Sequence, residues 1–283
     1  MSSPTAAAAP GRAAPSAVLR PYVRLTVAGF RQQSTYLGAA AAGVFTNAVF
    51  GFVKMAILLA TLAGAGGVAG GYTPELMVSY IFLSQGMLTA IGAFGGDGAL
   101  AERIRTGDIA VDFLRPVNVQ FATLATVLGG AVYSLIPRAL PLVAIGAATS
   151  MMAWAGEPAA YPLAALSVLL SIVLAQALLY CVQVLGFWVV DTRGIQMFYV
   201  VAGTFLMGMF VPVGLFPGWL ARIAEFTPFG WILMPPCDIL SGRIDAATGL
   251  TAVGIQAGWT VAVLAAGALL TAAGRRRLEV QGG

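Results

Sequence analysis

Long apolar runs separated by short polar stretches make up most of this chain. Runs of about 20 or more mostly apolar residues occupy 37–62, 75–96, 162–190, 194–215 and 251–273. A helix of this length crosses the hydrocarbon core of a bilayer, which is about 30 Å thick. The pattern therefore predicts an all-α integral membrane protein.

A further apolar stretch, 119–155, is interrupted by Pro137 and Arg138. It is too long for one straight crossing and only just long enough for two. Read as one kinked helix it gives six transmembrane helices in total, and read as two helices it gives seven.

The charges of the loops distinguish these alternatives. With six crossings, the loops on one side hold most of the arginines: Arg12, Arg20, Arg24, Arg31, Arg103, Arg105, Arg115, Arg193, Arg275, Arg276 and Arg277. The loops on the other side hold two arginines among five acids: Arg222 and Arg243 beside Glu75, Glu157, Glu225, Asp238 and Asp245. Basic loops stay cytoplasmic. We therefore predict a six-span protein of the inner (plasma) membrane with both termini in the cytoplasm.

Composition supports a membrane protein and removes several kinds of site. The chain has 59% hydrophobic and 9% charged residues, whereas soluble domains carry about a quarter charged residues. It has no histidine, and its one lysine, Lys54, follows no glycine-rich phosphate loop. The predicted spans contain no acidic relay for protons or sodium. We expect no catalytic, metal or nucleic-acid site, and any uphill transport needs energy from a partner.

The N-terminal region divides into two parts. Residues 1–15 are rich in Ala, Pro and Ser, which predicts a disordered tail. In 16–35 an apolar stripe recurs at helical spacing, with three arginines beside it: Leu19, Val23, Val27 and Phe30, against Arg20, Arg24 and Arg31. This pattern favours an amphipathic helix in the membrane interface, and the alternative is a solvated helix.

The charged loop 97–118 has the features of two short helices joined by a turn. Gly107 can end a helical turn in the left-handed conformation, and Asp108 can cap the next helix. Pro116 keeps that helix short. Ile109 and Phe113 share one of its faces, with Leu114 adjacent, which predicts an apolar ridge suited to docking in a protein groove.

Two sets of residues resemble ABC-2-type ABC transporter permeases. The first is Arg105-x-Gly107-x-Ile109 followed by Phe113-Leu114-x-Pro116-Val117, which resembles the loop whose coupling helix contacts the ATPase in that family. The second is Leu215-Phe216-Pro217-x-Trp219-Leu220, then Thr227-Pro228-Phe229, Pro236 and Ser241-Gly242-Arg243, which resembles the segment before the family's final helix. The likeness covers 16–280 and is greatest to a branch of small six-span permeases, formerly a domain of unknown function. Many members have Gly-Thr-Leu-Glu where this chain has Gly107-Asp108-Ile109-Ala110, so the role of that glutamate does not transfer.

The resemblance implies roles for three groups of residues. The ATPase-coupling group is Glu102, Arg103, Arg105, Gly107, Asp108, Ile109, Asp112, Phe113, Leu114, Arg115 and Pro116. An external re-entrant hairpin over 216–250 would include Pro217, Trp219, Arg222, Pro228 and Pro236, and its alternative is an interfacial helix anchored by tryptophan. Polar residues inside the spans are pathway candidates: Asn47, Lys54, Gln85, Gln176 and Gln183. Lys54 could instead extend to the outer interface.

The implied function is export of an amphiphilic or hydrophobic compound, such as an antibiotic, lipid or glycolipid. The implied partners are a dimer of ATPase subunits, which binds ATP and Mg²⁺, and a second permease, a paralogue being favoured over a second copy. A structural or assembly membrane protein and a passive channel are the alternatives. For the charged loop itself, the simplest alternative is a connector between two spans. A connector, a structural protein and a passive channel all lack a need for a short helix built for docking.

Overall fold

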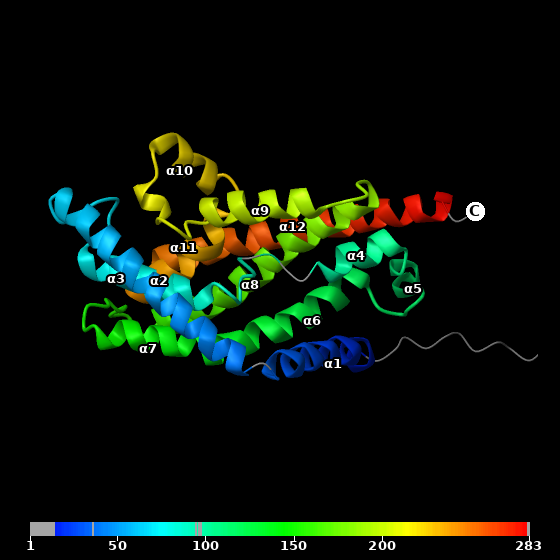
Figure 1. Cartoon of the computed structure of the whole chain (residues 1–283), viewed down its shortest axis with the longest axis horizontal. Coiled ribbons are helices and arrows are strands. Elements are labelled where there is room, and N and C mark those ends of the chain that lie inside the picture. Colours follow the sequence, from blue (N-terminus) through cyan, green and yellow to red (C-terminus); the bar gives the residue numbers. More distant parts are fainter. Residues whose placement is uncertain (1–14, 36, 94, 96–97, 282–283) are drawn as a thin grey trace, which may run out of the picture.

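The computed structural model describes residues 15–35, 37–93, 95 and 98–281, and this part of the chain forms an elongated helical bundle (Figure 1). The all-helical class is therefore confirmed. The predicted N-terminal tail lies almost wholly outside the described residues. In chain order the helices are α1 (Pro15–Ser34), α2 (Leu37–Gly64), α3 (Pro74–Met87), α4 (Ala99–Thr106), α5 (Ile109–Phe113), α6 (Val119–Ser134), a π-helical turn (Leu135–Ala139), α7 (Leu140–Ala148), α8 (Ala160–Val184), a 3₁₀ turn (Leu185–Phe187), α9 (Arg193–Leu206), a 3₁₀ turn (Val213–Leu215), α10 (Gly218–Glu225), α11 (Gly230–Ser241) and α12 (Ala246–Gln281).

Four helical segments of the described chain are long and apolar enough to cross a membrane. They are Ala40–Gly64, Val119–Ala148, Ala160–Phe187 and Ala246–Leu278. The other two predicted spans, 75–96 and 194–215, contain α3 and α9, which have 14 residues each. Helices of that length extend about 21 Å, less than the hydrocarbon thickness. Four spans are therefore established by length and composition, and six remain a prediction.

The apolar stretch after residue 118 forms one bent helical segment, as the loop charges predicted. Helices α6 and α7 are joined without a break by the π-helical turn Leu135–Ala139. Pro137 lies in this turn and has no N–H to donate, which explains why the regular ladder is interrupted there. The Arg138 guanidinium donates to the Thr89 hydroxyl at 2.7 Å. The helix ends at Ala148, earlier than the predicted limit of 155.

The predicted N-terminal helix is present as α1, and it packs closely against α6. A Cβ on Gly29 would lie 1.9 Å from the Thr126 carbonyl oxygen, and one on Gly129 would lie 1.9 Å from the Thr26 carbonyl oxygen. The two backbones can approach this closely because glycine has no side chain. The apolar stripe from Leu19 to Phe30 is exposed, although the Phe30 ring also contacts the Tyr133 ring of α6, with centroids 5.0 Å apart. Its placement in a membrane interface stays a prediction.

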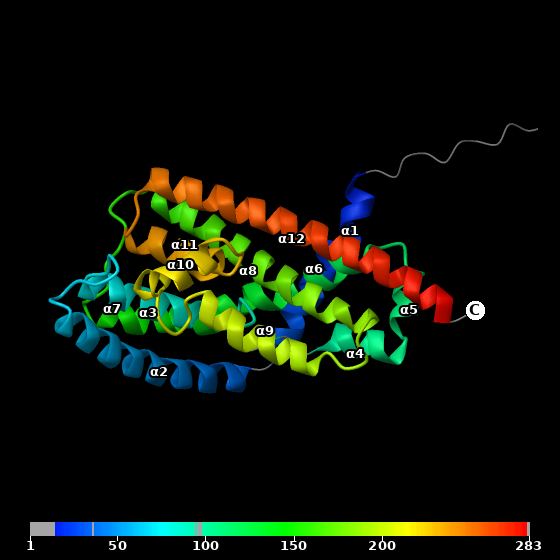
Figure 2. The ribbon, with the colours of Figure 1, turned by 90° about the horizontal axis from the view of Figure 1, so that it is seen from above.

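The centre of the bundle is built from α3, α8, α11 and α12. Helix α11 is buried along most of its length, including Ile232 and Leu233, and it packs against the other three helices. Gln256 of α12 is fully buried and donates to the Ser171 hydroxyl at 2.8 Å and to the Trp231 carbonyl at 2.9 Å. These bonds connect α12 to α8 and to the start of α11. Figure 2 shows α12 running along α8.

Candidate functional site

The predicted coupling residues lie at one end of the bundle. Helices α4 and α5 are found there together with the C-terminal end of α12 (Figures 1 and 2). Arg275 of α12 lies over the Phe113 ring of α5, at 5.5 Å from its centroid. Asp191, just before α9, and Arg193, its first residue, line a cavity together with Glu102 and Arg105 of α4. The structure thus gathers the arginine-rich loops, which the charge pattern assigned to one side of the membrane.

The turn between α4 and α5 has the geometry expected of a glycine. Gly107 ends α4 with φ +83°, and its N–H donates to the Ile104 carbonyl. Only glycine adopts this left-handed backbone without strain. The expectation for Asp108 is wrong in its detail: Asp108 stands at the start of α5, yet its carboxylate caps no backbone N–H of that helix. It instead accepts a hydrogen bond from the Thr106 hydroxyl at 2.7 Å.

Most of the predicted apolar ridge of α5 packs against the permease and is not available for docking. This corrects the sequence interpretation. Ile109 is only 1% exposed and packs in a cluster formed by α4, α6 and α8. Phe113 stacks on Phe187, just beyond α8, with ring centroids 6.3 Å apart. Leu114, in contrast, is 85% exposed. Ile109 and Phe113 therefore hold α5 to the permease, and Leu114 is the ridge residue available to a partner.

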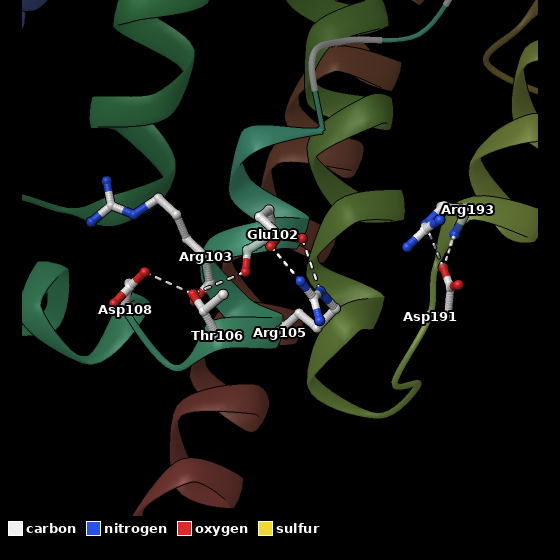
Figure 3. Close-up of polar contacts among 7 residues, drawn as sticks. All are labelled: Glu102, Arg103, Arg105, Thr106, Asp108, Asp191 and Arg193. Carbon is white, nitrogen blue, oxygen red and sulfur yellow. Dashed lines mark hydrogen bonds and ion pairs between the residues drawn. The ribbon is translucent and has the colours of Figure 1, made fainter.

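Ion pairs on the Asp112 carboxylate hold the two short helices together. Arg103 of α4 binds Asp112 of α5 at 2.6 Å, and Arg115 adds a longer contact of 3.4 Å to the same carboxylate. Arg105 and Glu102 pair on the exposed side of α4 at 2.5 Å. The hydrogen bonds from Arg105 lower the pKa of the Glu102 carboxyl. Figure 3 shows Arg103 extending on the side opposite to this second pair. Helix α5 ends at Phe113, three residues before Pro116, and is short as predicted.

The five pathway candidates do not form one site. Lys54 donates to the Met209 carbonyl at 2.6 Å and lies over the Tyr80 ring, so its ammonium group is held within the protein rather than at its outer surface. Asn47 and Gln85 are buried elsewhere. Gln176 and Gln183 of α8 line the same cavity of about 530 Å³, which also reaches Arg103 and Asp112.

The predicted hairpin region consists of two short helices with different surroundings. Pro217 precedes α10, which leaves Trp219 and Arg222 exposed. Pro228 lies in the turn before α11, and Pro236 is buried inside α11. A helical pair is therefore present, but one of its members is part of the core. A re-entrant position in a membrane is not established, and these five residues form no common site.

A buried ion pair beside α11 was missed from the sequence. Arg243 donates to both carboxylate oxygens of Asp238, at 2.6 and 2.5 Å, and lies over the Tyr72 ring. The Tyr72 hydroxyl also donates to Asp238 at 3.2 Å. Gly242, between the two charged residues, has φ +76°, which allows the chain to turn back. The lone acid in the apolar segment 229–240, five residues before an arginine, was the available signal.

The comparisons with known proteins agree with the resemblance found in the sequence. A family model described as "ABC-2 family transporter protein" matches residues 49–282, which is most of the chain. No curated protein and no solved structure matches it. The match covers α4, α5 and all four candidate spans except the first residues of the earliest one. This multi-pass membrane protein therefore belongs to the ABC-2 family of transporter proteins, as a membrane component of an ATPase-dependent transporter.

Proposed function

We propose that this chain is the permease subunit of an ATP-driven exporter in a bacterial inner membrane. Two permeases would form the pathway between them, and a dimer of ATPase subunits would dock on α4 and α5. The cargo would be an amphiphilic or hydrophobic compound, because the spans are apolar and hold few charges. ATP and Mg²⁺ would be bound by the ATPases.

The observation that carries this proposal is the construction of the α4–α5 unit. The exposed apolar side chain of Leu114 directly follows the five-residue helix α5, whose Ile109 and Phe113 are packed against the permease. Val111 of the same helix is also exposed. Charged residues flank it, with Arg103 and Arg115 paired to Asp112. An apolar anchor within a polar rim is the usual construction of a protein-docking surface. A connector between two spans does not require it.

Docking is tested by co-purifying the permease with its ATPase partner from the native membrane. Leu114→Ala should lower the binding free energy between permease and ATPase by about 2 kcal/mol, because a central apolar anchor is lost. This corresponds to a roughly thirtyfold weaker affinity and to less ATPase retained. Leu269→Ala is the matched control, since Leu269 is also a highly exposed leucine, on α12 within a membrane span. Arg115→Ala should have a smaller effect, seen mainly at low salt.

Phe113→Ala separates docking from folding. The stack of Phe113 on Phe187 lies within the permease. This variant should therefore lower the thermal stability of the purified permease, which Leu114→Ala should leave unchanged. If Leu114→Ala retained the ATPase as well as the wild type and exported normally, the docking role of α5 would be refuted.

The orientation in the membrane is tested by cysteine labelling of intact cells. With Cys181 and Cys237 replaced, single cysteines at Arg12 or Gly282 should resist an impermeant thiol reagent, whereas one at Asp245 should react. The support for this six-span arrangement is the sorting of arginines between the two ends of the bundle. Labelling at either terminus would exclude it.

A further inference from the structure

Arg138 is a charged residue inside a membrane span, and no acidic side chain of the described chain pairs with it. It lies in the π-helical turn Leu135–Ala139, within the candidate span Val119–Ala148. Its guanidinium donates to the Thr89 hydroxyl at 2.7 Å, and the ion pairs of the described residues do not include it. A guanidinium has several further N–H donors. Because a charge within a span is costly, such residues usually serve a binding or transport function.

Lys54 shows how the protein itself can satisfy a charge in a span. Its ammonium group donates to the Met209 carbonyl at 2.6 Å and lies 5.0 Å from the centroid of the Tyr80 ring. Arg138, in contrast, lies over no aromatic ring of the described residues, and its hydrogen bond goes to a neutral hydroxyl. The charge of Arg138 is therefore left for a ligand to compensate.

The guanidinium is fixed in position, and its remaining donors are accessible. A Cβ on Gly43 of α2 would lie 3.3 Å from the Arg138 Cζ, and one on Gly86 of α3 would lie 3.1 Å from the Ala139 Cα. The π-helical turn is thus held closely between these two helices. Arg138 is nevertheless only partly buried, and none of its nitrogens is both buried and unpaired. A ligand can therefore reach a guanidinium that is already oriented by Thr89.

Arg138 lies near the end of α2 that follows α1 (Figure 1). Gly43 is about 9 Å from the first residue of α2. A Cβ on Gly130, about 12 Å before Arg138 along the bent helix, would lie 3.7 Å from the Gln33 Cβ of α1. The sorting of loop charges predicts this end of α2 at the cytoplasmic surface, where the membrane carries anionic lipids. A long arginine side chain can extend from within a span to the level of the lipid headgroups.

The group that suits this position is a phosphate. The planar fork of a guanidinium pairs with two phosphate oxygens at once, and it gives up its hydration more readily than an ammonium group does. A zwitterionic headgroup would also need an acidic side chain for its cation, and no described acid pairs at Arg138. The lack of an acid therefore favours a headgroup with a net negative charge.

We propose that Arg138 binds the phosphate of an anionic phospholipid, such as phosphatidylglycerol, at the contact between α2 and the π-helical turn. This lipid is a ligand that stays in the membrane beside one permease, and it is distinct from the transported compound. Because α2, α3 and the bent helix meet at this turn, the bound lipid stabilises their packing.

Binding is measured on the full-length permease, freed of lipid in dodecyl maltoside, an uncharged detergent without phosphate. The probes are phosphatidylglycerol, phosphatidylcholine, diacylglycerol and free glycerol 3-phosphate. Phosphatidylglycerol should raise the thermal unfolding temperature saturably, because a ligand that binds the folded state stabilises it. Phosphatidylcholine should produce a much smaller shift, since its headgroup has no net charge. Diacylglycerol, without the phosphate, and glycerol 3-phosphate, without the acyl chains, should produce none.

Three variants test the assignment to Arg138. Arg138→Gln should weaken binding of phosphatidylglycerol at least about tenfold, because charge-assisted hydrogen bonds to the phosphate are lost. Without lipid it should be no less stable than the wild type, since an uncompensated charge is removed. Thr89→Val keeps the charge but removes the hydroxyl that orients the guanidinium, so it should weaken binding by less. Arg222→Gln is the matched control: it removes the same charge from an exposed arginine of α10 and should leave binding unchanged.

The proposal would be overturned by an equal shift with phosphatidylglycerol and any other probe. Glycerol 3-phosphate acting equally would assign the phosphate site to a soluble ester instead of a lipid. Wild-type binding by Arg138→Gln, or the same loss of binding in Arg138→Gln and Arg222→Gln, would also exclude a site at Arg138. No shift with any probe would mean that water satisfies the guanidinium. None of these measurements uses an ATPase or a transported compound, so they leave the proposed function standing.

Discussion

The left-handed turn at Gly107 allows a test of α5 that involves no change in packing. A Cβ placed there would have nothing within 4 Å, so a substitution alters the backbone energy alone. At φ +83° an L-residue costs about 1–2 kcal/mol relative to glycine. A β-branched residue costs more because its Cβ substituents crowd the backbone. Asn is the best tolerated non-glycine residue in this region.

In the series Gly107→Asn, Gly107→Ala and Gly107→Val, the fraction of molecules in which the hydrogen bonds of α5 are broken should therefore rise progressively. For valine, a cost of about 2 kcal/mol raises the open population roughly thirtyfold. Hydrogen–deuterium exchange of the peptide that contains 109–114 reports this directly, since the Ala110 N–H donates to the Gly107 carbonyl and the Val111 N–H to the Asp108 carbonyl. ATPase retention should fall in the same order. Indistinguishable exchange in the Asn and Val variants would refute the reasoning, because the two share the same open space.

Two further predictions concern stability, measured as thermal unfolding of the purified permease. Gly29→Ala should destabilise the α1–α6 contact by about 3 kcal/mol, because its Cβ would meet backbone atoms, whereas Gly38→Ala, with nothing within 4 Å, should be neutral or slightly stabilising. Asp238→Asn should cost about 2–3 kcal/mol by leaving Arg243 without its charge partner. In contrast, Asp191→Asn should cost less than about 1 kcal/mol, because the pair with Arg193 is exposed.

Local features of the fold were predictable because they depend on neighbouring residues. The left-handed turn at Gly107 and the short helix before Pro116 follow from the backbone preferences of glycine and proline. The bend near Pro137 follows from the missing N–H, and the continuity of the helix around it from the sorting of loop charges. The inferences from glycine and proline used chain segments shorter than one span, whereas the sorting of charges compared loops along the whole chain.

Features that depend on distant segments were not predictable. Helical spacing showed that Ile109 and Phe113 share a face, but it could not show what that face contacts. The neighbours are Phe187 and Arg275, far along the chain. The pair of Asp238 with Arg243 is local in sequence, but its burial depends on distant residues such as Tyr72, so it was interpreted only as two loop charges. Apolar segments also do not reveal where a helix stops, so that α3 and α9 were predicted longer than they are.

The inward position of Phe113 changes how motion of α5 would reach the membrane. Phe187 lies against the backbone of α12 at Gly274, where a Cβ would come within 2.2 Å of the ring. Phe113 thus contacts the ends of α8 and α12 together, through Phe187 and Arg275. Helix α12 has 36 residues and extends about 54 Å to the opposite end of the bundle. Within it Gln256 bonds to α8 and to the Trp231 carbonyl of α11. Under the proposed function, an ATPase that displaces Leu114 would therefore move a helix already bonded to the buried α11. With an exposed Phe113, α5 would keep Ile109 and the ion pair of Asp112 with Arg103, and it would lose its direct contact with the ends of α8 and α12.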